Sequence, residues 1–370
     1  MGPPEPPLFR RFPALAGRLP HRRYVEGPTP VEPLALEGLG GVELWVKRDD
    51  RSCPLYGGNK PRKLEFVIGR ALERGARRLV TTGGLGTNHG LATTILGRAA
   101  GLATTLVLVD QPVTPKVRES LLLMRAHGAE LVHGRGVAGA ALGVLATLAR
   151  GWLRGEKPYL VPTGGSSALG TLGFVGAALE LAEQVRAGAC PEPAELYVAV
   201  GSGGTLAGLV LGLRLAGLRT RAVGVLVTDV LPPSPARLAR LARASLGWLR
   251  RLDASVPDLQ LGPQDFALAS RQLGPGYGAT TPAAEAALRA AAGAGLSLET
   301  TYTAKCLAEI LARAREGAPA AGPWLFWNTY NGVDVAGRAP RRASVAELPR
   351  SIQALLAGCR SASPPGTGAG

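Results

Sequence analysis

The chain has 370 residues, of which 46% are apolar and 19% are charged. These proportions are typical of a folded chain with a large core and exclude extensive disorder, and the length suffices for two domains or one large α/β unit. The net charge of +15 invites a nucleic-acid hypothesis. However, only six of the 42 basic residues are lysines and the arginines are spread along the chain, so we attribute the charge mainly to composition.

The four cysteines stand alone, without a CxxC pair or a nearby histidine: Cys53, Cys190, Cys306 and Cys359. This pattern predicts a reduced chain with no structural zinc or other metal site. The N-terminus has early arginines but lacks the apolar core of a signal peptide. The longest apolar run, residues 137–149, is too short for a membrane span and predicts a buried helix. We therefore expect a cytoplasmic protein with no membrane partner.

The first strong signals in chain order surround one lysine. Residues 1–25 are rich in proline and arginine and predict irregular structure, and residues 42–47 alternate as a strand does. Gly57 and Gly58 then permit a tight turn, after which Pro61 suits the first position of a helix over residues 64–75. Lys60 would be the N-cap, where the helix dipole disfavours a cation. Such a lysine favours a nucleophile or a Schiff base, and an ordinary surface lysine is the alternative.

Beyond residue 75, strand and helix patterns alternate, which predicts α/β architecture with parallel sheets and a ligand site at the strand carboxyl ends. Strands are expected at 78–82, 104–109, 129–132, 158–162, 195–200, 222–227 and 324–326. Helices are expected at 88–102 and 117–127, after the strand at 129–132 as far as residue 154, at 169–187 and after 204.

Three segments that follow predicted strands carry the polar groups expected of a site. Residues 83–90 place glycines, Thr87, Asn88 and His89 at a helix N-terminus, although a simple glycine connector with a helix cap is the alternative. Residues 201–205, Gly-Ser-Gly-Gly-Thr, suit a phosphate, because glycines let backbone N–H groups approach an anion. Residues 327–332, with 274–278 and 302–303, offer hydroxyls and aromatic rings; tyrosines there could equally be core.

A dinucleotide site is a rival interpretation of the second segment. Asp229 ends the next strand about where a ribose-binding acid would lie. The fingerprint fails at its third glycine, which is Leu206, so we prefer a simple phosphate.

Taken together, these motifs resemble fold-type II pyridoxal-phosphate enzymes of the tryptophan synthase beta-like superfamily. The branch they resemble contains D-cysteine desulfhydrase and 1-aminocyclopropane-1-carboxylate (ACC) deaminase. The specific motifs are GGNKPRKLEF (57–66) and GSGGTLAG (201–208), supported by PTP (28–30), VKRDD (46–50), TGGSSALG (163–170) and GPGY (274–277). The resemblance covers residues 28–335 in one order. It implies two domains with parallel twisted sheets covered by helices, and a homodimer.

The resemblance also implies roles for single residues. Lys60 would carry pyridoxal 5'-phosphate as a Schiff base, Asn88 would bind its phenolic oxygen, and Thr87 would occupy the place of a catalytic serine, with His89 beside it. The remaining expected site residues are the phosphate loop Gly201, Ser202, Gly203, Gly204 and Thr205, the active-site tyrosines Tyr277 and Tyr302, and the pair Thr303 and Thr329.

The division into domains follows from the same resemblance. We expect a larger cofactor-binding domain from residues 1–62 and 169–350, a smaller mobile domain over 63–168, and a flexible tail over 351–370. The lysine segment and the phosphate loop lie about 140 residues apart and must meet at one cofactor.

The expected reaction is β-elimination from D-cysteine or a related β-substituted D-amino acid, giving pyruvate, ammonia and sulfide. Threonines at 303 and 329 favour a desulfhydrase, because deaminases of this family place an acid at the first position. Thr87 in place of serine, Leu91 in place of arginine, and Asn-Thr-Tyr-Asn at 328–331 depart from the pattern. An ACC deaminase, a serine/threonine dehydratase-like lyase and a cofactor-binding pseudoenzyme remain alternatives.

A nucleic-acid binder is the alternative that the charge suggests. Arg237, Arg240 and Arg243 recur every three residues, as in a basic helix face. A solvated helix face explains the same spacing, so we expect no specific nucleic-acid partner.

Overall fold

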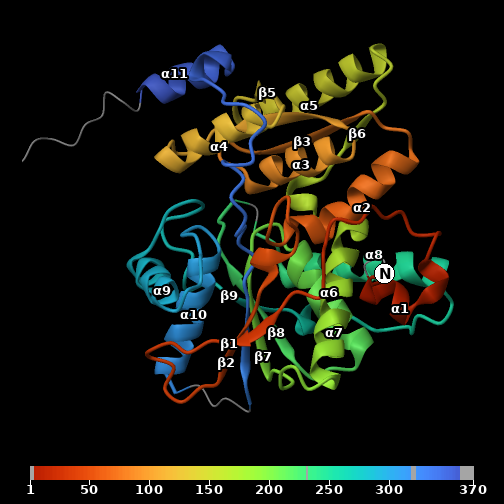
Figure 1. Ribbon diagram of the computed structural model, residues 1–370, viewed down its shortest axis with the longest axis vertical. Helices are drawn as coiled ribbons and strands as arrows, with labels where there is room; N and C mark the ends of the chain where they lie inside the picture. Colours follow the sequence, from red (N-terminus) through yellow and green to blue (C-terminus); the bar gives the residue numbers. More distant parts are fainter. Residues whose placement is uncertain (1–3, 231, 318–321, 359–370) are drawn as a thin grey trace, which may run out of the picture. The chain divides into compact units, whose positions relative to one another are not determined.

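A computed structural model describes residues 4–230, 232–317 and 322–358 (Figure 1). The chain forms two compact units, each described by itself below. Unit 1 consists of the residues up to Arg70 together with Gly164–Val333, and unit 2 consists of Ala71–Thr163 together with the residues from Asp334 onward. Unit 2 therefore includes residues 334–350, which the sequence-based division placed in the larger domain.

Unit 1 is built on a six-stranded sheet in which all neighbours are parallel except the first pair. The strands in spatial order are β1 (Val31–Pro33), β2 (Leu44–Lys47), β10 (Trp324–Trp327), β7 (Glu195–Val200), β8 (Arg221–Leu226) and β9 (Ala267–Ala269). The expected parallel α/β architecture is confirmed.

Two apolar cores cover the two faces of this sheet, because successive strand residues point to opposite sides. In β7, Leu196, Val198 and Val200 pack into one core, and Tyr197 and Ala199 pack into the other. The first core contains α1 (Pro7–Arg11), α6 (Ala168–Arg186), α7 (Gly204–Ala216) and α8 (Pro235–Leu252); the second contains α9 (Pro282–Gly293) and α10 (Thr303–Arg315).

Unit 2 is built on a four-stranded parallel sheet. Its strands in spatial order are β5 (Glu130–His133), β4 (Ala103–Val109), β3 (Arg78–Gly84) and β6 (Pro158–Leu160). The chain moves one way through β3, β4 and β5 and then returns to β6. Right-handed crossovers therefore place α3 (Asn88–Ala99) and α4 (Pro115–Ala126) on one face, and α5 (Gly136–Leu153) on the other (Figure 1).

The remaining elements are short, apart from α2 (Lys60–Glu73), which runs from unit 1 into unit 2. They are α11 (Arg350–Gly358) and the 3-10 helices η1 (Pro13–Leu15), η2 (Asp49–Arg51), η3 (Thr163–Gly165), η4 (Pro263–Asp265) and η5 (Val345–Glu347). Helix α11 starts the expected tail and buries Ile352 and Leu356. The rest of that tail, residues 359–370, lies outside the described residues.

Two local expectations are wrong. Helix α2 begins at Lys60 itself, so this lysine is not a cap outside the helix; Pro61 is then the second helical residue, which needs no intrahelical donor. Helix α5 is not buried, because Leu142 and Leu145 are 67% and 62% exposed. Within the described ranges, no helix has the length and apolar character needed to cross a membrane.

The three arginines of the possible nucleic-acid face lie on α8 and are exposed. The opposite side of the helix buries Leu238, Ala242 and Leu249, so α8 has the ordinary amphipathic pattern of a surface helix.

Candidate active site

The glycine turn before Lys60 is fixed by close backbone packing. A side chain on Gly57 would place its Cβ 2.0 Å from the Asp50 carbonyl oxygen, and one on Gly58 would lie 2.4 Å from the Thr329 carbonyl oxygen. Gly58 also has φ of +82°, in the left-handed region that favours glycine. The turn thereby sets the starting point of α2 and the position of Lys60.

The Lys60 amine is linked to the glycine loop of α7 through one neighbouring amide. Its Nζ donates to Asn59 Oδ1 at 2.6 Å, and Asn59 Nδ2 donates to Thr205 Oγ1 at 3.1 Å. Burial lowers the pKa of Lys60 from 10.5 to about 8, against a smaller opposing effect of the Glu299 carboxylate. The lysine is therefore unusually easy to deprotonate. Asn59 lies in a motif that we identified but was not assigned a role.

The expected phosphate loop joins β7 to α7. Gly203 is the N-cap of α7 and has φ of +89°, and a Cβ there would meet Leu238 Cδ2 at 2.5 Å. Gly204 has equally little room, because a Cβ would lie 2.5 Å from Ser166 Oγ. Only glycine suits these positions, which open the helix N-terminus where backbone N–H groups can bind an anion.

A second lysine, which is buried, lies beside this loop. Lys63 Nζ donates to Ser166 Oγ and to the Gly164 carbonyl oxygen, both at 3.2 Å. Ser166 Oγ in turn hydrogen-bonds Ser202 Oγ at 2.7 Å and accepts from the Gly204 backbone N–H at 3.2 Å. Burial, and secondarily the charge of Lys60, lower the pKa of Lys63 well below its usual value. The spacing of the TGGSSALG segment gave no sign that Ser166 would reach the loop, because this contact depends on the tertiary fold.

Two of the expected tyrosines meet. The hydroxyls of Tyr277 and Tyr302 are 2.8 Å apart, and their rings lie edge to face with centroids 6.0 Å apart. Burial raises the pKa of both phenols, so both stay protonated at neutral pH. Tyr302 also flanks the loop, because a Cβ on Gly201 would lie 3.3 Å from its ring.

Glu299, which the sequence did not single out, fixes the residues that precede α10. Its Oε1 accepts from the backbone N–H groups of Tyr302 at 2.7 Å and of Thr303 at 2.9 Å. Thr303 Oγ1 accepts from the Glu299 backbone N–H at 3.0 Å, and Thr303 is buried. Asp229, the residue of the rejected dinucleotide site, holds Tyr277 in a similar way, by accepting from its backbone N–H at 2.9 Å.

The segment after β10 supports the glycine turn. Asn331 Oδ1 accepts from the Gly57 backbone N–H at 2.6 Å, and the Gly332 N–H donates to the Asp50 carbonyl oxygen at 3.1 Å. The carbonyl oxygen of Thr329 packs closely against Gly58. Residues 328–331, which depart from the family pattern, therefore include the Asn331 side-chain amide, which stabilises the turn before Lys60.

A buried network of charges lies on the other side of α2. Arg62 donates to Asp49 at 2.7 and 2.9 Å and to Glu180 at 2.9 and 3.1 Å. Lys47 Nζ donates to Glu180 at 2.6 Å, and Trp327 Nε1 donates to Asp49 at 2.8 Å. The two cations and two anions balance, so the network is neutral. Burial raises the pKa of Glu180, but the charges of Arg62 and Lys47 outweigh it and lower the pKa overall.

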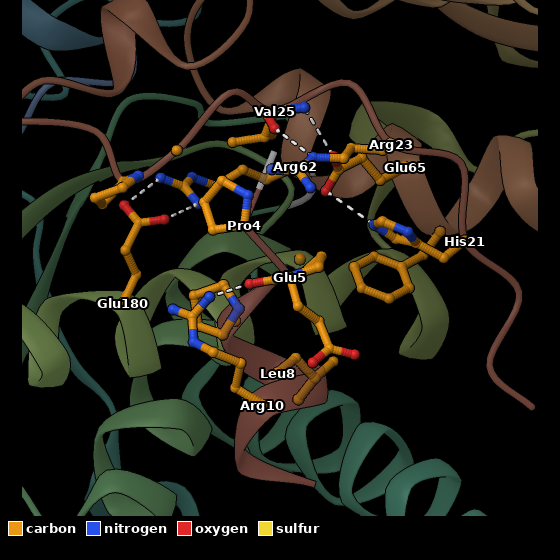
Figure 2. A pocket seen from close by; sticks show the side chains of 17 residues that line it. Pro4, Glu5, Leu8, Arg10, His21, Arg23, Val25, Arg62, Glu65 and Glu180 are labelled. Atoms are coloured by element: carbon orange, nitrogen blue, oxygen red, sulfur yellow. Dashed lines mark hydrogen bonds and ion pairs between the residues drawn. The ribbon is translucent and has the colours of Figure 1, made fainter. Parts of the chain in front are cut away.

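A cavity of about 330 Å³ borders this network (Figure 2). It is lined by the N-terminal segment, by α6 and by the Arg62, Glu65 and Phe66 face of α2. Its lining includes none of the expected site residues, so we do not regard it as the active site.

The other expected site residues belong to unit 2. Thr87 is the N-cap of α3 and accepts from the Gly90 N–H at 3.2 Å, as the connector alternative predicted. Asn88 is exposed in the first turn. His89 is buried, with Nε2 3.1 Å from Thr81 Oγ1; because Thr81 donates its proton to the Val161 carbonyl, His89 Nε2 must be the donor.

Pyridoxal phosphate fits the groups gathered in unit 1. It requires an amine that loses its proton easily, which Lys60 provides, and a phosphate site of N–H and hydroxyl donors. The loop from Gly201 to Thr205 provides such a site, next to the Ser166 hydroxyl and the Lys63 amine.

Comparison with known proteins defines the class. Residues 22–329 match the family described as pyridoxal-phosphate dependent enzyme. The chain belongs to this family, which confirms the cofactor and the fold type expected from the motifs.

The chain is also similar to individual proteins within and around this family. The chain is 34% identical over 306 residues to proteins named D-cysteine desulfhydrase from Salmonella typhimurium and Salmonella paratyphi C, covering 80% of this chain and 88% of each relative. A crystal structure of an ACC deaminase homologue superposes with a TM-score of 0.72 and 29% identity, covering 89% of this chain and 95% of that one. A hydrogen sulfide-producing enzyme of Fusobacterium nucleatum shares the fold, with a TM-score of 0.58 and 15% identity over 84% and 95% of the two chains.

Proposed function

We propose that this protein catalyses the pyridoxal-phosphate-dependent β-elimination of a small amino acid, and that its substrate is D-cysteine or a related β-substituted D-amino acid. The products would be pyruvate, ammonia and sulfide. The observation that carries the proposal is the Lys60 amine, with a pKa of about 8 and a link through Asn59 to the glycine loop. The names of the relatives at 34% identity support the substrate.

The residues of unit 1 have separable tasks. When bound, pyridoxal phosphate supplies the electron sink for cleavage of the Cα–H bond. Lys60 Nζ would hold the cofactor and, once the substrate amine has taken its place, would in its neutral form accept the proton that leaves Cα. The Tyr277–Tyr302 pair, neutral because both phenols are buried, can donate a proton to the departing thiolate as the Cβ–S bond breaks. Water then hydrolyses the released enamine to pyruvate and ammonia.

Unit 2 would supply the remaining groups. We propose that Asn88 binds the phenolic oxygen of the cofactor, in keeping with its exposed place at the start of α3. Thr87 and His89 stay proposals for substrate binding. Both side chains are engaged inside unit 2, so either would have to exchange a hydrogen bond to reach a substrate.

Neutral side chains favour the desulfhydrase over the deaminase. Thr303 and Thr329 would leave the pyridine nitrogen of the cofactor less protonated than an acid would, so the electron sink is weaker. A weaker sink is adequate for a good thiol leaving group and less suited to opening a cyclopropane ring. Because the structure is similar to that of an ACC deaminase homologue, ACC is included among the substrates tested below.

The first experiment identifies the cofactor lysine. The purified protein should absorb in the visible, lose that band on borohydride reduction and yield a reduced adduct on the peptide containing Lys60. Lys60→Ala should lack the adduct, whereas Lys63→Ala should retain it on Lys60. An adduct on Lys63 in the wild-type protein would refute the assignment.

The second experiment identifies the substrate. Pyruvate, ammonia and sulfide release from D-cysteine is compared with turnover of L-cysteine, D- and L-serine and ACC. We expect D-cysteine to be fastest. Faster release of 2-oxobutanoate from ACC would overturn the argument from the two threonines, turnover of L-serine alone would indicate a dehydratase, and a bound cofactor without turnover would indicate a pseudoenzyme.

We further propose that the protein acts in the cytoplasm as a homodimer and has no specific nucleic-acid partner. Free, buried Cys53, Cys190 and Cys306 are consistent with a reducing compartment. The homodimer rests on the family resemblance.

A further inference from the structure

A fully buried lysine lies three residues after Tyr302 and has no task in the proposed reaction. Lys305 is the third residue of α10, and its side chain is completely excluded from solvent. Burial of an ammonium group costs free energy unless the group is paired. A methionine has a similar length and would fill the same space without a charge. Packing alone therefore does not explain why an amine stands at this position.

The Lys305 amine connects α10 to a separate segment of unit 1. Its Nζ donates to the Leu273 carbonyl oxygen at 2.8 Å. Leu273 directly precedes the loop of residues 274–278, which carries Tyr277. The hydrogen bond therefore joins the helix that follows Tyr302 to the loop that carries the other tyrosine of the pair.

The loop of residues 274–278 depends on outside contacts for its conformation. Its three glycines, at 274, 276 and 278, all have positive φ. A segment so rich in glycine has many conformations open to it when nothing fixes it. Asp229 fixes the loop at Tyr277, by accepting from the Tyr277 backbone N–H at 2.9 Å. Lys305 fixes the residue immediately before the loop, so the two contacts hold the chain on either side of Gly274 and Gly276.

The charges around Lys305 favour its role as a strong donor. Glu299 accepts from the Tyr302 backbone N–H at 2.7 Å, as Asp229 does from that of Tyr277. Burial lowers the pKa of Lys305, and the charges of these two carboxylates oppose that effect. An ammonium group donates a stronger hydrogen bond to a carbonyl than a neutral amine does. The two carboxylates that fix the tyrosines thus also support the cation that fixes the loop.

We propose that Lys305 is a positioning residue for the elimination: by donating to the Leu273 carbonyl, it ties the loop of residues 274–278 to α10 and keeps the Tyr277 hydroxyl within hydrogen-bonding distance of Tyr302. This inference rests on the proposed function, in which the Cβ–S bond breaks with its electron pair on sulfur and the tyrosine pair gives a proton to that sulfur. Lys305 itself exchanges no proton with the substrate.

The kinetic test compares two leaving groups on the holoenzyme. D-cysteine loses a thiolate, which a general acid assists, whereas β-chloro-D-alanine loses chloride, which needs no proton. Lys305→Met should lower kcat for D-cysteine about tenfold or more, and kcat for β-chloro-D-alanine less than about twofold. Lys116→Met, which changes a lysine with 68% side-chain exposure, should alter neither rate. Equal losses with the two substrates, or no loss with either, would overturn the proposal.

A double variant shows whether Lys305 acts through the tyrosine. If the lysine only positions Tyr277, the Lys305→Met change should reduce kcat for D-cysteine much less in a Tyr277→Phe background, because the hydroxyl that it positions is already absent. Equal reductions in the two backgrounds would show that Lys305 acts by another route and would refute the proposal.

Hydrogen exchange of the apoprotein tests the contact independently of any reaction. Lys305→Met, and Lys305→Gln with an amide one bond shorter than the lysine amine, should both speed exchange in residues 273–279 and leave α9 unchanged. Unchanged exchange in a variant with wild-type circular dichroism would overturn the inference. Loss of the fold in both variants would assign Lys305 a structural role and overturn it as well. Faster exchange in the variants, with no turnover of D-cysteine by the wild-type protein, would support the contact and refute the proposed function instead.

Discussion

At the scale of single residues, the first turn of α2 contains two lysines, of which Lys60 is half-buried and Lys63 is buried, and their partners distinguish them. Lys60 contacts an amide that bridges to Thr205, whereas Lys63 contacts Ser166 and the Gly164 carbonyl. Burial lowers the pKa of both amines, and the charge of Lys60 lowers that of Lys63 further. Two ammonium groups so close are unfavourable, which favours a neutral Lys60 when an anion occupies the loop beside Lys63.

The pKa of Lys60 predicts how the apoprotein captures its cofactor. The neutral amine is the nucleophile, so the capture rate should rise about tenfold per pH unit up to pH 8 and level off above it. Stopped-flow absorbance after mixing apoprotein with pyridoxal phosphate measures this rate. Lys60→Ala is the control and should show no visible band. A rate that keeps rising through pH 10 would indicate an ordinary lysine.

In the loop before α7, we expect substitution of Gly203 to weaken binding of the cofactor. Gly203→Ala adds a Cβ at φ +89° against Leu238, so it should weaken cofactor retention at least about tenfold. Gly217→Ala is the matched control: it lies at the other end of α7 with φ +74°, and no atom lies within 4 Å of its added Cβ. Dialysis followed by absorbance measures retention. Equal retention in the two variants would mean that the phosphate is bound elsewhere.

At the scale of elements, α2 is fixed at both faces. The glycine turn and Asn331 fix its first residue, and the Arg62–Asp49–Glu180–Lys47 network anchors its opposite face to β2 and α6. A buried ion pair contributes little net stability compared with apolar packing, but loss of one partner leaves an unbalanced charge inside. The network therefore resists displacement of α2 more than it adds stability.

Two carboxylates one turn apart on α6 test this argument. Glu180→Gln leaves Arg62 and Lys47 with one buried anion and should reduce the free energy of unfolding by about 3–5 kcal/mol. Glu183→Gln removes an ion pair with Arg10 in which both side chains are 39% exposed, and should cost under about 1 kcal/mol. Urea titration of the holoenzyme followed by circular dichroism gives both values. Similar midpoints for the two variants would show that the buried network is not charge-balanced as described.

At the scale of the whole molecule, the residues that we propose for the site belong to two different units. Lys60, the phosphate loop and both tyrosines belong to unit 1, and Thr87, Asn88 and His89 belong to unit 2. If both sets serve one cofactor, substrate binding must change the environment of the loop before α3.

Hydrogen exchange measures that change. Addition of D-alanine, which has an amine but no leaving group on Cβ, should slow exchange in residues 83–90 of unit 2. Exchange in α8, whose residues take no part in the proposed site, serves as the internal reference. If D-alanine changes the visible spectrum while residues 83–90 exchange as before, the prediction that this loop responds to the substrate is wrong.

The sequence by itself determined the architecture and the cofactor class. Strand and helix periods depend on residues near one another in the chain, so the alternation of elements and the parallel sheets could be predicted. The tight turn at Gly57 and Gly58 and the loop at Gly203 and Gly204 could also be predicted from the sequence, because backbone conformation and close approach restrict those positions to glycine.

The tertiary structure decided which side chains join the motifs. Asn59, Ser166 and Asn331 contact partners that lie up to 274 residues away, as Asn331 does on Gly57, and no local pattern encodes such contacts. The same reason explains the error at α5. Its apolar run predicts a helix, but which face is buried depends on how closely glycines 143 and 151 approach the sheet, and only packing in three dimensions decides that.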